Sequence, residues 1–151
     1  MAEITSFKKE IQKNSSAYLD TNIFIYHLED RLPYSELTQI IFDKTEEKSL
    51  QAHTSALTLL ELNVKPYQLN RPDRALAHFA LLKNLPHLFI HSLNPEMSDT
   101  AARLRAKYKL KTPDAIHLAC ALESRSEIMI GNDKGLKKIA DIHYLYLNDY
   151  L

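Results

Sequence analysis

Residues 110–122, "LKTPDAIHLACAL", predict a helix that begins at a polar turn and is then buried on most of its sides. Thr112 and Pro113 are typical of a helix start, because proline suits the first helical turn, where its missing N–H is not needed. Asp114 follows in that first turn. Its carboxylate either complements the helix dipole, which is worth about 0.3–1 kcal/mol, or faces a positive partner from another part of the chain.

Strand-like and helix-like segments alternate on both sides of this helix. Strands are expected at 17–20, 50–55, 87–93, 127–131 and 142–147. Helices are expected at 21–30, 34–49, 56–67, 72–85, 95–108, 112–124 and 134–140. Ser55 or Thr54 is expected to cap the third of these helices, and Pro66 to end it. This order predicts an α/β fold with a central parallel sheet and helices on both faces.

The chain has 151 residues, enough for one domain with its own core, and 45% of them are hydrophobic. Residues 1–16 are polar and mixed in charge, so we expect a polar N-terminal arm there, helical or loose, ahead of a single domain at 17–151. Cys120 is the one cysteine, which excludes an intrachain disulfide and fits a reducing compartment. The sequence contains no secretory signal and no run of transmembrane length, so we expect a cytoplasmic protein without a membrane partner.

The formal net charge is +0 at pH 7, which argues against bulk electrostatic binding of long nucleic acid. One segment departs from this balance, since 100–113 contains basic residues and no acidic one. This basic block consists of Arg103, Arg105, Lys107, Lys109 and Lys111. It either contacts an RNA backbone beside Asp114 or is a solvated helix face.

Two carboxylates follow predicted strands. Asp20 closes the first strand, and Asp133 follows the fourth, between the only glycines of the chain, Gly131 and Gly135. Ligands of open α/β sheets gather outside the carboxyl ends of the strands. Short polar neighbours are expected to orient these acids by hydrogen bonds, and they are Thr21, Asn22 and Asn132.

Two further acids, Glu61 and Asp114, lie on helices that are otherwise largely apolar. Burying an unpaired carboxylate is costly, and Lys65 is the only local partner for Glu61. Taken singly, each of the four acids has an ordinary explanation as a cap, a turn residue or part of an ion pair. Taken together, they indicate an oxygen-only cluster that binds Mg²⁺ or Mn²⁺ rather than Zn²⁺. His117, one turn after Asp114, is interpreted as a core histidine.

These motifs resemble those of PIN domains, in particular the VapC-like toxins of bacterial and archaeal toxin–antitoxin pairs. The resemblance is carried by "YLDTNIFIYHLE", "TSALTLLEL", "LKTPDAIHLACAL" and "GNDKGLKKI", and it extends from about Tyr18 to the C-terminus. It implies a three-layer α/β/α PIN-like fold and a metal-dependent endoribonuclease that uses Mg²⁺ or Mn²⁺. It also implies an RNA substrate, a small inhibitory antitoxin and a homodimer.

By the same resemblance, the catalytic and metal-binding residues are Asp20, Glu61, Asp114 and Asp133. Supporting positions of the family pattern match Asn22, which orients the first acid, Thr112, Asn132 and, only loosely, Asp99. The sequence departs from the pattern where Asp20 lies late, behind residues 1–16, and where Lys109 stands at a common glycine position. Gly131 stands where threonine or serine is common, which is expected to weaken hydrogen bonding near Asp133.

Other functions stay open on the residues alone. One is a PIN fold that binds RNA or a protein without cutting it. A phosphotransfer enzyme of the haloacid dehalogenase kind needs a second aspartate where Asn22 stands, and a receiver-like domain needs an aspartate that "AHTSAL" does not offer. For an antitoxin, we expect a docking surface that includes Ile23, Tyr26 and Ile40, unless these are core residues.

Overall fold

The computed structural model describes residues 2–151, which form one five-stranded sheet with every neighbouring pair of strands parallel. The strands are β1 (Ser16–Leu19), β2 (Gln51–Ser55), β3 (Leu88–His91), β4 (Ile128–Gly131) and β5 (His143–Tyr146). The helices are α1 (Ala2–Lys13), α2 (Thr21–Leu28), α3 (Tyr34–Glu46), α4 (Ala56–Gln68), α5 (Pro72–Asn84), α6 (Pro95–Tyr108) and α7 (Thr112–Glu123), with 3-10 helices η1 (Lys134–Lys138) and η2 (Leu147–Tyr150). None of the helices within residues 2–151 combines the length and apolarity that a bilayer crossing needs.

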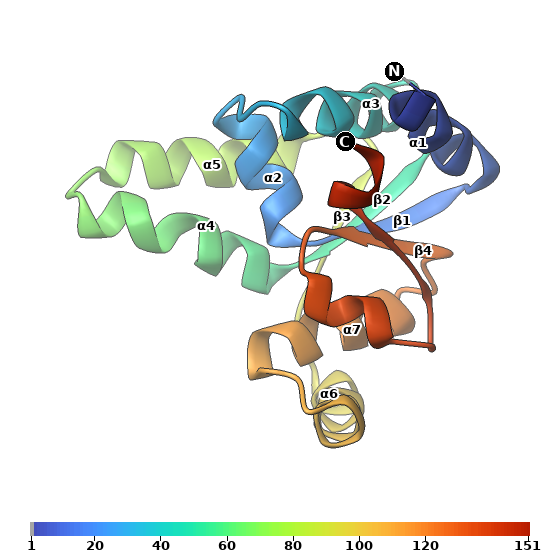
Figure 1. The fold of residues 1–151 in the computed structure, drawn as a ribbon. Coiled ribbons are helices and arrows are strands. Elements are labelled where there is room, and N and C mark those ends of the chain that lie inside the picture. Colours follow the sequence, from blue (N-terminus) through green and yellow to red (C-terminus); the bar gives the residue numbers. More distant parts are fainter. Residues whose placement is uncertain (1) are drawn as a thin grey trace.

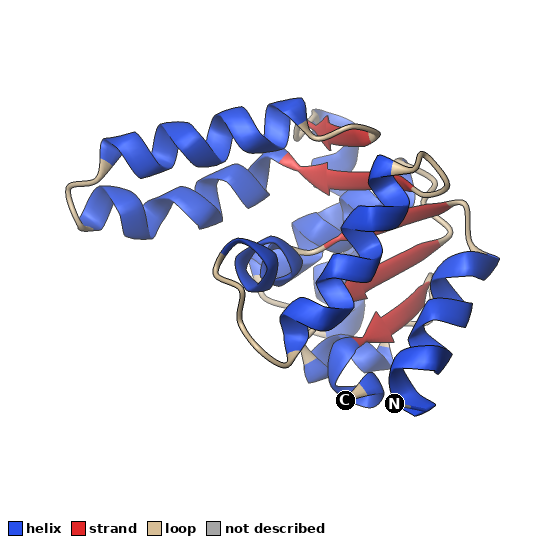
Figure 2. Cartoon of the chain, turned by 90° about the horizontal axis from the view of Figure 1, so that it is seen from above, coloured by secondary structure: helices blue, strands red, loops and turns tan. Residues whose placement is uncertain are grey.

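The sheet is the middle of three layers (Figures 1 and 2). Successive residues of a strand point to opposite faces, and β1 follows this rule. Ala17 and Leu19 pack into the hydrophobic cluster that includes residues of α1, α2 and α3, whereas Tyr18 packs into the cluster that includes residues of α6 and α7. All three side chains are fully buried. The three-layer α/β/α fold expected from the sequence is therefore confirmed.

The strand order, β3-β2-β1-β4-β5, places β1 at the centre of the sheet. The chain adds β2 and β3 on one side of β1 and then adds β4 and β5 on the other, and such a reversal creates a crevice at the carboxyl ends of the central strands. Leu19 of β1 lies beside Ile130 of β4. The fold therefore brings Asp20 and the segment that contains Asp133 to the same edge of the sheet.

The first helix is part of the folded domain. Phe7 and Ile11 are 0% and 2% exposed and belong to the core cluster that α3 shares. The ring of Tyr150 packs against Phe7 with ring centroids 5.1 Å apart. The part of the predicted arm that forms α1 is thus a packed helix, and the four-residue spacing of Phe7 and Ile11 is the sequence signal for it.

Two local predictions are wrong. Pro66 does not end its helix, since α4 continues to Gln68 with Pro66 buried inside it. Pro66 has no N–H to donate within the helix, and α4 extends only two residues beyond it. The Pro66 carbonyl accepts a hydrogen bond of 2.7 Å from Arg71 N, just after the helix end. Ile23 and Tyr26 are 0% and 9% exposed and belong to the core, so they do not form a docking surface, and Ile40 packs partly buried against the same cluster.

Helices α4 and α5 form a hairpin, residues 56–84, that projects from the body of the molecule (Figure 2). Ser55 caps its first helix as predicted, by accepting a hydrogen bond from Leu57 N at 3.0 Å. The hairpin carries many exposed apolar side chains, namely Leu60, Val64, Tyr67, Leu69, Leu76, Phe79 and Leu81. Exposed apolar side chains gathered on one element are typical of a surface that binds another protein.

Candidate active site

Asp20 lies where β1 ends and α2 begins. It is 7% exposed, and its Oδ1 accepts a hydrogen bond of 2.7 Å from Thr21 N, which makes it the N-cap of α2. Burial raises the pKa of the Asp20 carboxyl above its ordinary value, and the neighbouring charges of Glu61 and Asp133 act in the same direction, against His117 and the Thr21 amide. A carboxylate in this position needs positive charge nearby.

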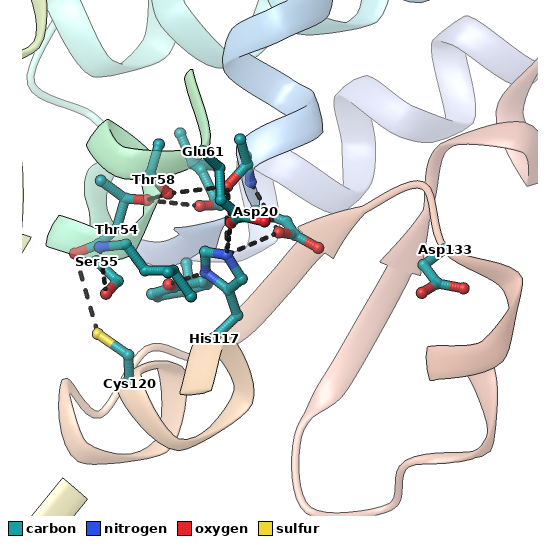
Figure 3. Close-up of polar contacts among 12 residues, drawn as sticks. Asp20, Thr54, Ser55, Thr58, Glu61, His117, Cys120 and Asp133 are labelled. Carbon is teal, nitrogen blue, oxygen red and sulfur yellow. Dashed lines mark hydrogen bonds and ion pairs between the residues drawn. The ribbon is translucent and has the colours of Figure 1, made fainter. Parts of the chain in front are cut away.

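Glu61 is held by two side chains from other elements (Figure 3). It accepts a hydrogen bond of 2.7 Å from Thr21 Oγ1 and one of 2.6 Å from His117 Nε2. Partial burial opposes ionisation of Glu61, but the bonds from His117 and Thr21 outweigh it and lower the pKa of the glutamate. The partner of Glu61 is therefore His117 rather than Lys65.

His117 is buried, as expected of a core histidine, but the sequence interpretation missed its contacts with the acids. It is 1% exposed, and its Nε2 lies 3.5 Å from Asp20 Oδ1 as well as next to Glu61, while its Nδ1 lies 2.6 Å from Tyr18 Oη. Burial works against the charged imidazole, but the hydrogen bond to Glu61 and the charge of Asp20 raise the pKa of His117. Its spacing from Asp114, one helical turn, was the available signal, but only the fold shows which acids it meets.

Asp114 lies in the first turn of α7 and is partly buried. Burial raises the pKa of its carboxyl, followed by the charges of Asp133 and Asp20, with a smaller contribution from Glu61. Asp114 therefore shares one electrostatic environment with the other three acids. Within residues 2–151, His117 is the only basic side chain at ion-pair distance from any of the four.

Asp133 lies at the margin of this group. Its Oδ1 accepts a hydrogen bond of 2.8 Å from Gly135 N and caps η1, and Figure 3 shows its carboxylate set apart from the hydrogen-bonded side chains around His117. Asn132 is engaged elsewhere, because its Nδ2 donates to Tyr26 Oη at 3.1 Å and its Oδ1 accepts from Asn148 N at 3.1 Å. The asparagine thus fixes the turn rather than the carboxylate.

The other supporting residues divide into two groups. Thr21 joins the site through its backbone N–H and its hydroxyl, and Asn22 is partly buried one residue further along α2. Thr112 is exposed at the start of α7. Asp99 is exposed on α6 and pairs with Arg103 at 3.3 Å, so its loose match to the family pattern has no structural counterpart in the site.

The four acids offer only carboxylate oxygens, which is the donor set that Mg²⁺ and Mn²⁺ favour. Their combined negative charge exceeds what one imidazole can balance. Burial raises the pKa of Asp20 and Asp114 most, and the charges of the neighbouring acids add to it. Among the described residues, however, no three histidine, cysteine, aspartate or glutamate side chains already stand in a geometry that could hold a metal ion. The donor set and the charge fit a divalent cation, whereas the present rotamers leave Glu61 turned onto His117.

The basic block is only partly free to meet a substrate. Arg103 pairs with Asp99, the Arg105 Nε donates to the Leu110 carbonyl at 3.1 Å, and Lys107 lies 3.5 Å from Asp141. Lys109 and Lys111 are exposed and flank the turn into α7.

Residues 17–142 match the family described as PIN domain. The chain belongs to the PIN domain family. This finding agrees with the resemblance carried by the sequence motifs around Asp20, Glu61, Asp114 and Asp133. No curated protein sequence matches the chain.

Solved structures similar to this PIN domain include a toxin–antitoxin complex from Klebsiella pneumoniae, with 27% identity, a TM-score of 0.63, and coverage of 83% of this chain and 94% of that chain. DNA-bound VapBC from Salmonella typhimurium shares 18% identity, with a TM-score of 0.67 and coverage of 87% and 97%. VapBC2 from Rickettsia felis, bound to a promoter DNA fragment, shares 14% identity, with a TM-score of 0.66 and coverage of 87% and 98%. The last two show likeness of fold alone.

Proposed function

We propose that this PIN domain is a Mg²⁺- or Mn²⁺-dependent endoribonuclease and the toxin of a VapBC-type toxin–antitoxin pair. The observation that supports this most directly is the gathering of Asp20, Glu61 and Asp114 from three separate elements at one edge of the sheet. There burial, and after it the charges of neighbouring acids, raise the pKa of Asp20 and Asp114, and a divalent cation would stabilise the ionised carboxylates.

In this proposal Asp20, Glu61 and Asp114 hold the cation, and Asp133 holds a second one or positions water. A bound Mg²⁺ or Mn²⁺ lowers the pKa of water and polarises the scissile phosphate. One of the carboxylates would take the proton of the water that attacks phosphorus. The P–O bond to the leaving ribose oxygen would break as the new one forms, and that oxygen would take a proton from solvent. The Thr21 amide keeps Asp20 in place, and the hydroxyl of the same residue fixes Glu61 from the protein side.

The RNA backbone would approach the start of α7. Backbone N–H groups at a helix start attract phosphate, and the exposed Lys109 and Lys111 flank this start. Arg103, Arg105 and Lys107 contribute less, because each already contacts an oxygen of the chain itself. The substrate is therefore expected to meet Asp114 and the two lysines together.

A small antitoxin and a second copy of the chain are the proposed protein partners. The similar structures from Klebsiella pneumoniae and Salmonella typhimurium are toxin–antitoxin and VapBC complexes. The exposed apolar side chains of the α4–α5 hairpin offer an area for such a partner, in place of the buried Ile23 and Tyr26.

A second candidate is a PIN domain that binds RNA or protein without cutting. It is favoured by the hydrogen bond between Glu61 and His117, which keeps the glutamate away from a shared metal position among the described residues. The two functions differ in whether added Mn²⁺ draws Glu61 away from the histidine and switches on cleavage.

The experiment that tests the enzyme is cleavage of labelled RNA with Mg²⁺ or Mn²⁺ by the natural chain and by Asp20→Asn. Asparagine keeps an oxygen for the Thr21 amide but loses the charge, so the fold is expected to survive. Cleavage is expected to fall by more than the roughly 10–100-fold typical of residues outside the metal shell.

Asp43→Asn is the matched control, because Asp43 is exposed on α3 and its carboxylate accepts a hydrogen bond from Gln39 in the same helix. It should cut RNA as the natural chain does. A folded Asp20→Asn variant that keeps the parental rate would contradict the proposed site, and a natural chain inactive with both metals would favour the binding module.

A further inference from the structure

Gly131 ends β4 in a place where a side chain cannot fit. A Cβ atom added there would lie 2.7 Å from Tyr144 Oη and 3.2 Å from Asp20 Oδ2. The first distance is shorter than real carbon–oxygen contacts allow. Because Gly131 has no Cβ, there is room for the Tyr144 hydroxyl beside Asp20.

Tyr144 comes from β5, two strands away from β1, and its hydroxyl reaches the backbone of Asp133. It accepts a hydrogen bond of 3.0 Å from Asp133 N and donates one of 3.2 Å to the Asp133 carbonyl. Burial raises the pKa of the Tyr144 phenol, so the group stays a neutral hydroxyl that both accepts and donates. Both peptide groups of Asp133 are thereby fixed by one side chain.

We infer that Tyr144 is a positioning residue of the site, whose hydroxyl fixes the backbone of Asp133 through the space that Gly131 leaves open. This inference rests on the proposed metal-dependent activity. The hydroxyl holds the turn after β4 and thereby keeps Asp133 at the edge of the sheet where Asp20 lies. A backbone N–H that loses its acceptor away from water is unfavourable, so loss of the hydroxyl is expected to redirect this short turn.

Gly131 and the Tyr144 hydroxyl depend on each other, so variants at both positions test the inference. A serine at 131 can accept from the N–H two residues later, a common turn interaction, but in the natural chain its Cβ collides with Tyr144. Removing the Tyr144 hydroxyl eliminates the shortest contact of that serine. The contacts with Asp20 Oδ2 at 3.2 Å and Asp20 Cβ at 3.3 Å remain and require only small shifts. The single variants Tyr144→Phe and Gly131→Ser are therefore each expected to be impaired, and the double variant to recover.

Three measurements on the full chain test this: Mn²⁺ affinity by calorimetry, kcat and KM for RNA, and amide exchange of Asp133 by NMR. Tyr144→Phe is expected to weaken Mn²⁺ binding and to lower kcat by about 10-fold, in the range found for residues that orient metal ligands. KM for RNA should stay unchanged, and the Asp133 amide should exchange faster. Gly131→Ser should weaken Mn²⁺ binding as well, and the double variant should return to within about threefold of the natural chain.

Tyr150→Phe is the matched control, because this partly buried tyrosine packs against Phe7 of α1. It should match the natural chain in all three measurements. Unchanged Mn²⁺ affinity and unchanged Asp133 exchange in Tyr144→Phe would overturn the inference, as would a double variant no better than either single one. If Tyr144→Phe does not fold, an unimpaired Gly131→Ser variant overturns it instead. A natural chain that neither binds Mn²⁺ nor cuts RNA contradicts the proposed function, whereas the exchange data still judge the role of Tyr144.

Discussion

Asp20 is almost fully buried among other negative charges, which is unfavourable for a residue that only caps a helix. Its pKa is raised, so the folded state holds its proton more tightly than the unfolded state does. Between the ordinary pKa and the raised one, stability without metal therefore falls as the pH rises. A divalent cation, as proposed above, would relieve this cost.

Replacing Asp20 by Asn is expected to raise the unfolding free energy of the metal-free protein at pH 7 by about 1 kcal/mol, because the buried charge is removed and the cap is kept. Added Mn²⁺ should stabilise the natural chain, since it binds only the folded state, and should leave Asp20→Asn unchanged. Thermal unfolding with and without Mn²⁺ measures both effects. Equal stabilisation of the two proteins by Mn²⁺ would argue against Asp20 as a ligand.

At this scale the sequence predicts some members of the site better than others. Asp20 and Asp133 were predictable because strand ends of a parallel sheet converge on one edge. His117 and Tyr144 were not, because their partners lie on other elements and no local pattern encodes those contacts. The expected weakness near Asp133 had the same origin, since the hydroxyl that contacts the Asp133 backbone comes from a strand residue thirteen positions after Gly131.

Among the elements, the turn between α6 and α7 shows how lysine can occupy a position where glycine is common in the family pattern. Lys109 closes α6 with φ 55° and ψ 42°, the left-handed conformation that glycine adopts most easily. This explains why glycine is common at that position and why lysine there is strained. The strained residue, Lys109, is itself one of the two exposed lysines that the proposed function places beside the RNA backbone.

Lys109→Gly is expected to raise the unfolding free energy by about 0.5–1 kcal/mol, because the left-handed strain is removed while some backbone entropy is lost. Lys107→Gly, two residues earlier and within α6, should lower it by about 1 kcal/mol. Chemical denaturation of the two variants makes the comparison. If Lys109→Gly also weakens RNA cleavage, the lysine charge contributes to substrate binding.

The edge of the sheet at β2 and β3 contains a second buried polar group. His53 Nδ1 lies 2.7 Å from His91 Nε2, and burial, with the nearby charges of His91 and His87, lowers the pKa of His53 to about 4. The unfolded chain binds a proton at this residue near pH 6.5, before the folded chain does. Stability is therefore expected to fall as the pH drops from about 6.5 towards 4.

His53→Gln is expected to flatten this dependence, with a gain of about 1 kcal/mol relative to the natural chain at pH 5. The exposed His143 provides the control, and His143→Gln should keep the slope. Denaturant titrations at several pH values between 4 and 7 give the answer. A His53→Gln profile as steep as that of the natural chain would assign the acid sensitivity to other groups.

Element types were read correctly from the sequence because strands and helices differ in period, 2 against 3.6 residues. Pro66 was misjudged because the rule that proline ends a helix is local, whereas the ring is here buried in the α4–α5 hairpin. The N-terminal helix was left undecided because two buried residues give a weak apolar stripe among many charges.

For the molecule as a whole, α1 closes one side of the core although it lies before the matched family region. Phe7→Ala is expected to lower the unfolding free energy by about 3–5 kcal/mol, as for other fully buried phenylalanines. Lys8→Ala, on the exposed side of the same helix, should change it by less than about 0.5 kcal/mol. Denaturant unfolding of both variants tests whether α1 is part of one cooperative unit.

The projecting α4–α5 hairpin has a consequence for control of the molecule. Glu61 belongs to α4, so this acid is mounted on the one element that stands out from the body (Figure 2). A protein that bound the exposed apolar side chains of the hairpin and tilted it would move Glu61 away from Thr21 and His117. It would not need to contact the other acids of the site. Such a partner would inhibit the chain from a distance, because movement of the hairpin would displace the Glu61 carboxylate.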